Sequence, residues 1–175
     1  IQGFFDMPVD NLFTTPLFSK FIKRKISSKN LICVSPDMGG VARTRALATR
    51  LKADLAIIDK RRPAPGKSQV MNIIGDVENK TCIIVDDIID SGGTIVNAVD
   101  ALKKKGAKEV YVFITHAVLS GEAAKKIKNS KIKKLIITDS IDNSNKIKNN
   151  NKIEVLSISS LMSEAIKRIA NSNSV

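Results

Sequence analysis

The sequence predicts a three-layer α/β domain built on a mainly parallel β-sheet. Several segments of strand length are apolar throughout, without alternating polar residues, which is typical of strands buried on both faces. Helix-like segments separate them, and this alternation indicates βαβ units with right-handed crossovers. Strands are expected at residues 31–34, 55–58, 82–85, 110–115 and 135–138, and helices at residues 41–51, 94–105, 122–128 and 161–169.

The expected helices show the apolar spacing of a single buried face. Within residues 94–105, the side chains of Ile95, Val99 and Leu102 recur at helical intervals. Gly106 follows a run of lysines there, and both features are typical of a helix C-terminus. The last helix repeats the apolar pattern, so both stripes are assigned to the core.

Two segments are expected to be loops. The Asn-rich residues 142–152 are predicted to form a surface loop that tolerates insertions. Residues 61–69 hold two prolines, a glycine and three basic residues between apolar stretches. That composition predicts a mobile functional loop, with a plain connection as the alternative.

Length and composition limit the class of protein. A chain of 175 residues fits one domain, expected to span residues 1–175. It is 43% hydrophobic, 26% charged and 4% aromatic, as expected for a soluble globular protein with an aliphatic core. No apolar stretch of about 18 residues and no leader-like start is present, so we expect a cytoplasmic protein.

The charge balance predicts an anionic partner. With 29 Lys and Arg against 17 Asp and Glu, the formal charge is +12. Nucleotides, sugar phosphates and nucleic acid all fit this sign, which does not choose among them. Many of the lysines lie in residues 125–152, where they are interpreted as a solvated face.

Neither the cysteines nor the histidine predicts a structural metal or a disulfide. Cys33 and Cys82 lie in apolar segments, where a thiol usually behaves as a small buried hydrophobe. His116 is the single histidine, and a zinc site needs several Cys or His ligands.

The strongest functional motif is Cys-Ile-Ile-Val-Asp-Asp-Ile-Ile-Asp-Ser-Gly-Gly-Thr at residues 82–94. An apolar strand leads into Asp86 and Asp87, and a Gly92-Gly93 turn then opens a helix. Ligands bind at the carboxyl ends of parallel strands, so the acids are expected to face a crevice. The glycines let successive N–H groups wrap an anion, and the positive end of the helix dipole favours phosphate there.

Two carboxylates beside a phosphate are unexpected, because all three groups are negatively charged. Asp86 and Asp87 fit that place if they accept hydrogen bonds from a sugar diol or help to hold Mg²⁺. Helix capping is the alternative, but a cap needs one acid and no glycine pair. The motif therefore predicts a site for a sugar phosphate.

This motif resembles the phosphoribosyl-pyrophosphate loop of proteins with the type I phosphoribosyltransferase fold. Other segments resemble the ribose-phosphate pyrophosphokinases in particular, including Gln-Gly-Phe-Phe near the start, Ser-Pro-Asp-Met-Gly-Gly, Asp-Lys-Arg-Arg-Pro and Asn-Ile-Ile-Gly-Asp-Val. The resemblance weakens only in the Asn-rich stretch and the tail. The segments that carry it are residues 1–12, 35–40, 59–63, 70–77, 82–94 and 115–121.

The resemblance implies an activity and a role for each matching residue. The family makes phosphoribosyl pyrophosphate and AMP for nucleotide biosynthesis, by transferring the diphosphoryl group of ATP to the 1-hydroxyl of ribose 5-phosphate with Mg²⁺. Residues 61–69 are then expected to close over the bound nucleotide. The implied roles are 5-phosphate binding for Asp90, Ser91, Gly92, Gly93 and Thr94, ribose binding for Asp86 and Asp87, Mg²⁺ binding for Asp37, and catalysis for Lys60 and Arg62.

The resemblance also implies an incomplete enzyme. The family has an upstream half of similar fold, which supplies most ATP contacts and a histidine in an Asp-Leu-His segment. This chain is therefore expected to be the C-terminal half, binding sugar phosphate weakly and making little or no product alone. Its expected partners are ribose 5-phosphate, ATP and further copies of itself in a homo-oligomer, with no nucleic acid and no membrane.

Two other functions fit parts of the sequence. A nucleobase phosphoribosyltransferase would share the acid pair and glycine turn but would not need residues 59–63. A non-catalytic regulatory relative could sense phosphoribosyl pyrophosphate and bind nucleic acid, but no nucleic-acid-binding motif is present. His116 is not expected to be catalytic, because the family associates its segment with subunit contacts and nucleotide regulation.

Overall fold

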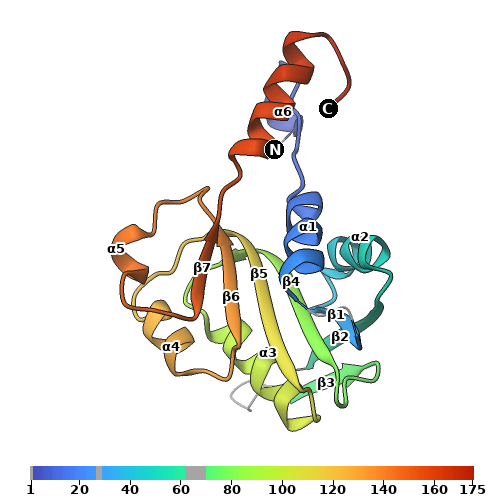
Figure 1. Cartoon of the computed structure of the whole chain (residues 1–175), viewed down its shortest axis with the longest axis vertical. Helices are drawn as coiled ribbons and strands as arrows, with labels where there is room; N and C mark the ends of the chain where they lie inside the picture. The colour runs from blue at the N-terminus through green and yellow to red at the C-terminus, as the bar shows by residue number, and fades with distance from the viewer. Residues whose placement is uncertain (1, 27–28, 62–69) are drawn as a thin grey trace.

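A computed structural model describes residues 2–26, 29–61 and 70–175 of the chain. They form one seven-stranded sheet in the order β3-β2-β1-β4-β5-β6-β7 (Figure 1). All neighbouring strands are parallel except β2 and β3, which are antiparallel. The strands are β1 (Leu31–Ser35), β2 (Asp54–Arg61), β3 (Val70–Ile74), β4 (Thr81–Ile89), β5 (Glu109–Ala117), β6 (Lys134–Thr138) and β7 (Ile153–Leu156).

Helices cover both faces of the sheet, which confirms the three-layer α/β prediction. One face packs against α1 and α2, and the other against α3 and α4. The predicted helices appear as α2, α3, α4 and α6, whereas α1, β3 and β7 were not predicted. The helices are η1 (Gln2–Phe4), α1 (Thr15–Lys25), α2 (Val41–Leu51), α3 (Gly93–Lys104), α4 (Ala123–Asn129), α5 (Ser144–Ile147) and α6 (Ser159–Ala170).

The buried strands supply both cores at once. Successive side chains of a strand point to opposite faces, so Ile83 of β4 joins the core under α1 and α2 while Ile84 joins the core under α3 and α4. Aromatic packing fixes α1 on the sheet, with the ring centroids of Phe18 and Phe113 5.3 Å apart. This double burial explains why these strands are apolar throughout.

The cysteines behave as predicted. Cys33 and Cys82 are both free and fully buried. Burial raises the pKa of each thiol to about 12, so both stay protonated at neutral pH.

No helix in the described ranges is long and apolar enough to cross a membrane.

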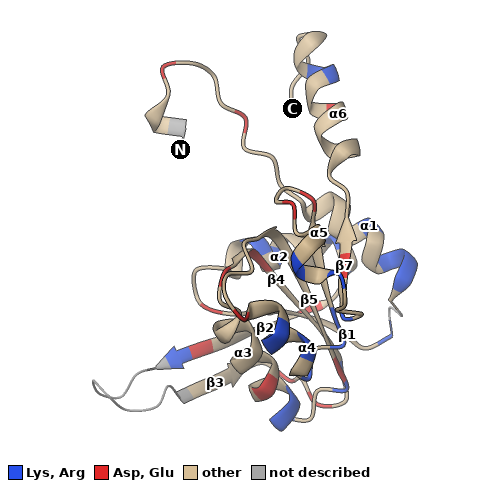
Figure 2. Ribbon diagram, turned by 90° about the vertical axis from the view of Figure 1, so that its left-hand side faces the viewer, with Lys and Arg blue, Asp and Glu red and all other residues tan. Residues whose placement is uncertain are grey.

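The prediction that the last helix packs its apolar stripe into the core is wrong. In α6 only Ala165 is buried, whereas Ile166 is 62% and Ile169 is 56% exposed. The helix follows β7 and projects beyond the sheet instead of folding back over it (Figure 1). The N-terminal segment projects in the same direction, with Phe4 89% exposed (Figures 1 and 2).

The Asn-rich stretch is more ordered than predicted. It contains the short helix α5, and two of its asparagines are buried. Asn143 donates a hydrogen bond to the carbonyl of Ala117 at 2.7 Å, and Asn150 donates to that of Ala124 at 2.8 Å. Both asparagines therefore hold this segment onto β5 and α4, and insertions next to them would break these bonds.

Candidate functional site

The acid pair lies at the carboxyl end of β4, in a pocket of about 440 Å³. The strand extends through the acids to Ile89, four residues beyond its predicted end at Val85. Asp86 is half-buried and Asp87 is exposed. The pocket is lined by Asn11, Leu12, Phe13, Thr14, Thr15, Arg43, Val85, Asp86, Asp87, Ile88, Thr115 and His116.

Arg43 joins the two acids, and sequence reasoning missed it. Its guanidinium donates one hydrogen bond to Oδ1 of Asp86 at 2.5 Å and another to Oδ2 of Asp87 at 2.8 Å. The residue lies in the first turn of α2, which follows β1, and β1 is the parallel neighbour of β4. The sequence signal was an arginine three residues after a Gly-Gly pair, and the sequence alone did not place it beside the acids.

The environment shifts the pKa values of the two acids in opposite directions. Burial raises the pKa of Asp86 to about 6, although the charge of Arg43 opposes this shift. The hydrogen bond from Arg43 lowers the pKa of Asp87, and the same bond raises the pKa of Arg43. At neutral pH the pair is ionised and partly neutralised by one guanidinium.

The predicted phosphate turn directly follows the acid pair. Gly92 has φ of 75°, the left-handed conformation that glycine adopts without strain, and it precedes the first residue of α3. A Cβ on Gly93 would meet nothing within 4 Å, so the space above this residue is open. In the part of the chain that the structure describes, no side-chain hydrogen bond caps this helix, so its first N–H groups can bind an anion.

Contacts behind the turn hold it in place. Ser120 donates a backbone hydrogen bond to the carbonyl of Asp90 at 3.2 Å, and Nζ of Lys126 donates to the carbonyl of Ser91 at 3.3 Å. Thr94 follows in the first turn of α3, with its side chain exposed. The turn is thus anchored through its carbonyls, which leaves its N–H groups for a ligand.

A second group forms at the carboxyl ends of β1 and β2. In the loop after β1, Asp37 accepts a hydrogen bond from the N–H of Gly40 at 2.9 Å. Lys60 of β2 places its Nζ 4.0 Å from Oδ2 of Asp37. On β2 itself, an acidic band lies directly before the basic end of the strand (Figure 2).

The other predicted catalytic residue, Arg62, lies outside the described residues, as do residues 62–69 of the expected lid. The strands on either side of them are described. Arg61 pairs with Val70 in the antiparallel ladder of β2 and β3. The described part of this ladder therefore ends one residue beyond Lys60.

The parallel sheet explains why these groups meet. Carboxyl ends of parallel strands share one edge, so β2, β1 and β4 bring Lys60, Asp37 and the acid pair together. His116 of β5 lines the pocket, and its Nδ1 lies 3.0 Å from Oγ of Ser140. The predicted ribose, phosphate and metal residues thus lie along a single edge.

The residues present fit a magnesium ion held together with a substrate. Within the described residues, no three His, Cys, Asp or Glu side chains are grouped to hold a metal. Magnesium, however, commonly uses one or two carboxylates together with substrate phosphates and waters. The half-exposed carboxylate of Asp37 is suited to that role.

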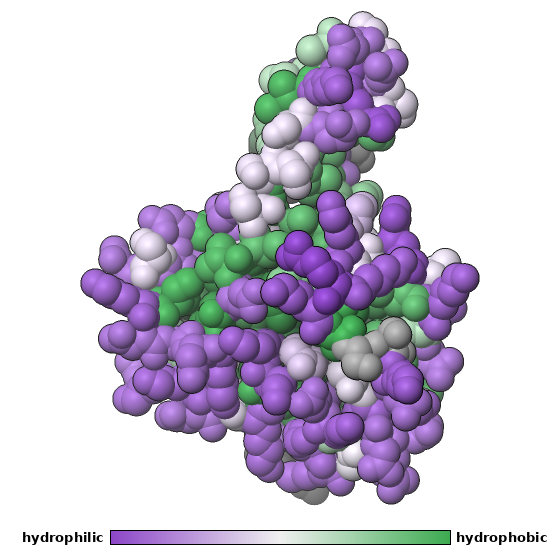
Figure 3. Space-filling model, in the orientation of Figure 1, coloured by the Kyte–Doolittle hydropathy of each residue, from purple (hydrophilic) through white to green (hydrophobic). Residues whose placement is uncertain are grey.

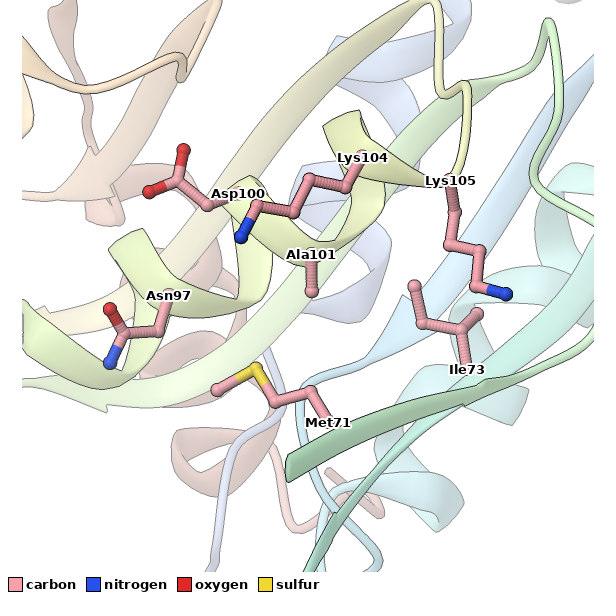
Figure 4. A pocket seen from close by; sticks show the side chains of 7 residues that line it. All are labelled: Met71, Ile73, Asn97, Asp100, Ala101, Lys104 and Lys105. Carbon is pink, nitrogen blue, oxygen red and sulfur yellow. The ribbon is translucent and has the colours of Figure 1, made fainter. Parts of the chain in front are cut away.

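Another pocket, of about 530 Å³, lies between β3 and α3 (Figure 4). Met71 and Ile73 of β3 face Ala101 and Lys104 of α3 across it. It adjoins the C-terminal half of α3, whereas the glycine turn lies at the amino end of that helix. It is therefore separate from the site.

Fold and site together define an α/β domain of the phosphoribosyltransferase type, with an open glycine turn beside an acid pair. A purine phosphoribosyltransferase structure from Pyrococcus horikoshii shares the fold, with a TM-score of 0.52 and 24% identity over 62% of this chain and 73% of that one. The chain belongs to the phosphoribosyl synthetase family, since residues 59–175 match the family model described as the phosphoribosyl synthetase-associated domain.

Close relatives agree with this assignment. The ribose-phosphate pyrophosphokinase of Bradyrhizobium diazoefficiens is 57% identical over 100% of this chain and 55% of its own length. The crystal structure of phosphoribosylpyrophosphate synthetase from Mycobacterium smegmatis has a TM-score of 0.87 and 35% identity, over 98% of this chain and 55% of that one. The chain thus spans about half the length of both relatives.

Proposed function

We propose that this chain forms the ribose 5-phosphate half of the active site of a ribose-phosphate diphosphokinase. The complete enzyme transfers the diphosphoryl group of ATP to the 1-hydroxyl of ribose 5-phosphate, giving phosphoribosyl pyrophosphate and AMP. The observation that carries the proposal is the acid pair followed directly by an open glycine turn at the amino end of α3. The names of the relatives support it.

Each part of the site has a role in binding the sugar. The N–H groups of residues 90–94 and the hydroxyls of Ser91 and Thr94 hold the 5-phosphate, assisted by the dipole of α3. Asp86 and Asp87 accept hydrogen bonds from the ribose hydroxyls. The 5-phosphate and the ribose hydroxyls of one ligand molecule are thereby held by adjacent parts of a single segment.

Lys60 acts on the transferred group. Diphosphoryl transfer concentrates negative charge on phosphate oxygens, and preorganised cations stabilise that charge. Lys60 supplies this charge from β2, and Arg62 is proposed to add to it. Asp37 holds Mg²⁺, which when bound neutralises phosphate charge.

The remainder of the enzyme supplies most of the nucleotide contacts. Apolar side chains support this proposal, because Phe13, Met162 and Ile166 are exposed where α6 and the N-terminal segment project from the carboxyl edge. Figure 3 shows apolar atoms gathered between the polar body and α6. We propose that the complete enzyme is a cytoplasmic homo-oligomer that binds ATP.

Ligand binding by this chain tests the proposal. The chain is titrated with ribose 5-phosphate while its amide chemical shifts are monitored by NMR. The signals of residues 90–94 and of Asp87 are expected to move. Ribose without the phosphate is the control and should shift them far less, since the turn then has no dianion to hold. If ribose 5-phosphate left these signals unmoved, the sugar-phosphate site would be rejected.

A second assay separates the enzyme class from its relatives. The complete enzyme is incubated with phosphoribosyl pyrophosphate and a panel of nucleobases. No base should be consumed, whereas ribose 5-phosphate and ATP with Mg²⁺ should give AMP. Consumption of any base would favour a nucleobase phosphoribosyltransferase.

A further inference from the structure

The acid pair is held by one guanidinium, which hydrogen-bonds one oxygen of each carboxylate. Arg43 uses Oδ1 of Asp86 and Oδ2 of Asp87, so each acid gives it one of its two oxygens. All three side chains line the same pocket. The fork thus fixes two carboxylates relative to each other inside the cavity where a sugar would bind.

Two adjacent carboxylates need such a clamp. Like charges at contact distance repel, and without a counter-charge one acid of a close pair retains its proton. A protonated oxygen donates a hydrogen bond, whereas a sugar diol needs acceptors. The charges facing the clamp are Asp86, Asp87 and, at longer range, Asp37.

The fork of Arg43 also has the right shape for this role. Its planar N–H groups reach two acceptors in fixed directions, which a lysine ammonium cannot match. Arg43 belongs to α2, a regular helix packed on the sheet, so the fold fixes the position from which its guanidinium orients the carboxylates. The fork binds one oxygen of each carboxylate, and the second oxygen of each is the acceptor that the proposal assigns to a hydroxyl.

We propose that Arg43 is a positioning residue that presents one oxygen of Asp86 and one of Asp87 to the vicinal diol of the sugar phosphate, and so selects ribose over 2-deoxyribose. This inference rests on the proposed function and names its sugar specificity. Arg43 acts through the two acids and makes no contact with the reacting atoms.

The test compares ribose 5-phosphate with 2-deoxyribose 5-phosphate on this chain and its variants. The unchanged chain should prefer the ribose compound about tenfold, because one hydrogen bond to a charged group is lost. Arg43→Met should weaken ribose 5-phosphate binding about tenfold or more and bring the preference close to one. Arg45→Met is the matched control, because Arg45 is exposed on the same helix and lines a different pocket.

Arg43→Lys separates charge from geometry. It keeps the positive charge, so carboxyl ¹³C titration should give an Asp86 midpoint near that of the unchanged chain, whereas Arg43→Met should raise it. The lysine lacks the fork, so the preference for ribose should stay reduced. If Arg43→Lys restored the full preference, the forked geometry would be unnecessary and the proposal wrong.

The outcomes also separate this inference from the proposed function. If the unchanged chain and Arg45→Met bind ribose 5-phosphate, and Arg43→Met binds with the same affinity and preference, only the role of Arg43 is overturned. If neither the unchanged chain nor the control binds any sugar phosphate, the site itself is overturned and this role with it. A merely structural role for Arg43 would lower stability yet leave the preference intact.

Discussion

Two neighbouring glycines of the turn do different things. Gly92 has φ of 75°, so any side chain there is strained, whereas Gly93 has open space above its Cα. Gly92→Ala is expected to lower the free energy of unfolding by about 1–2 kcal/mol, the usual cost of a left-handed non-glycine residue. Chemical denaturation measures this loss.

Gly93→Ala should have the opposite profile. The new methyl group meets no atom of the protein, so the free energy of unfolding should stay within about 0.5 kcal/mol of the unchanged chain. The methyl group would instead occupy the space where a phosphate approaches the N–H groups, and ribose 5-phosphate should bind more weakly. Unchanged binding to Gly93→Ala would place the phosphate elsewhere.

Asp86 makes stability depend on pH in a predictable direction. Burial raises its pKa from 3.8 to about 6, so the folded chain holds the proton more tightly than the unfolded chain. Ionising Asp86 therefore costs stability as pH rises from 3.8 to about 6. Asp87 shifts the other way, so its contribution is present above its unfolded pKa and is lost at lower pH.

Asp86→Asn isolates this effect. The variant lacks the ionisation, so the difference in unfolding free energy should move in its favour across that interval and then level off. Denaturation in a buffer series from about pH 4 to about pH 8 measures the difference. A constant difference over the whole range would mean that Asp86 titrates at its ordinary pKa.

At the scale of elements, prediction succeeded where burial dictates the sequence. The central strands are apolar throughout because they face two cores, so β1, β4, β5 and β6 were located from the sequence. Edge strands carry no such pattern, and β3 and β7 were not predicted. The stripe of α6 is as apolar as that of α3, and sequence pattern alone does not say which partner covers it.

The contrast between α6 and the core predicts unequal stability effects. Phe113 is fully buried and packs on both Phe18 and Phe21. Phe113→Ala should lower the free energy of unfolding by about 3–5 kcal/mol through the cavity left behind. Ile166→Ser, in exposed α6, should change it by no more than about 0.5 kcal/mol. Urea denaturation of both variants tests this, and a large loss from Ile166→Ser would mean that α6 packs on the domain.

At the scale of the whole molecule, the site is a property of topology. The motif gave Asp86, Asp87 and the glycine turn because they are contiguous, and Asp37 and Lys60 came only through resemblance to a family. Arg43 has no motif of its own. Its role depends on β1 lying beside β4, so that the helix after one strand reaches the acids at the end of the other.

This topology also predicts that different strands supply the residues for substrate binding and those for turnover. Lys60 comes from β2, two strands away from the acid pair and turn of β4. In the complete enzyme, Lys60→Ala should slow turnover by roughly a hundredfold or more, as expected for removal of one preorganised charge. The KM for ribose 5-phosphate should change little, because the proposed sugar contacts come from β4 and α3. Lys20→Ala, on the exposed side of α1, is the control, and unaltered turnover in Lys60→Ala would remove Lys60 from the mechanism.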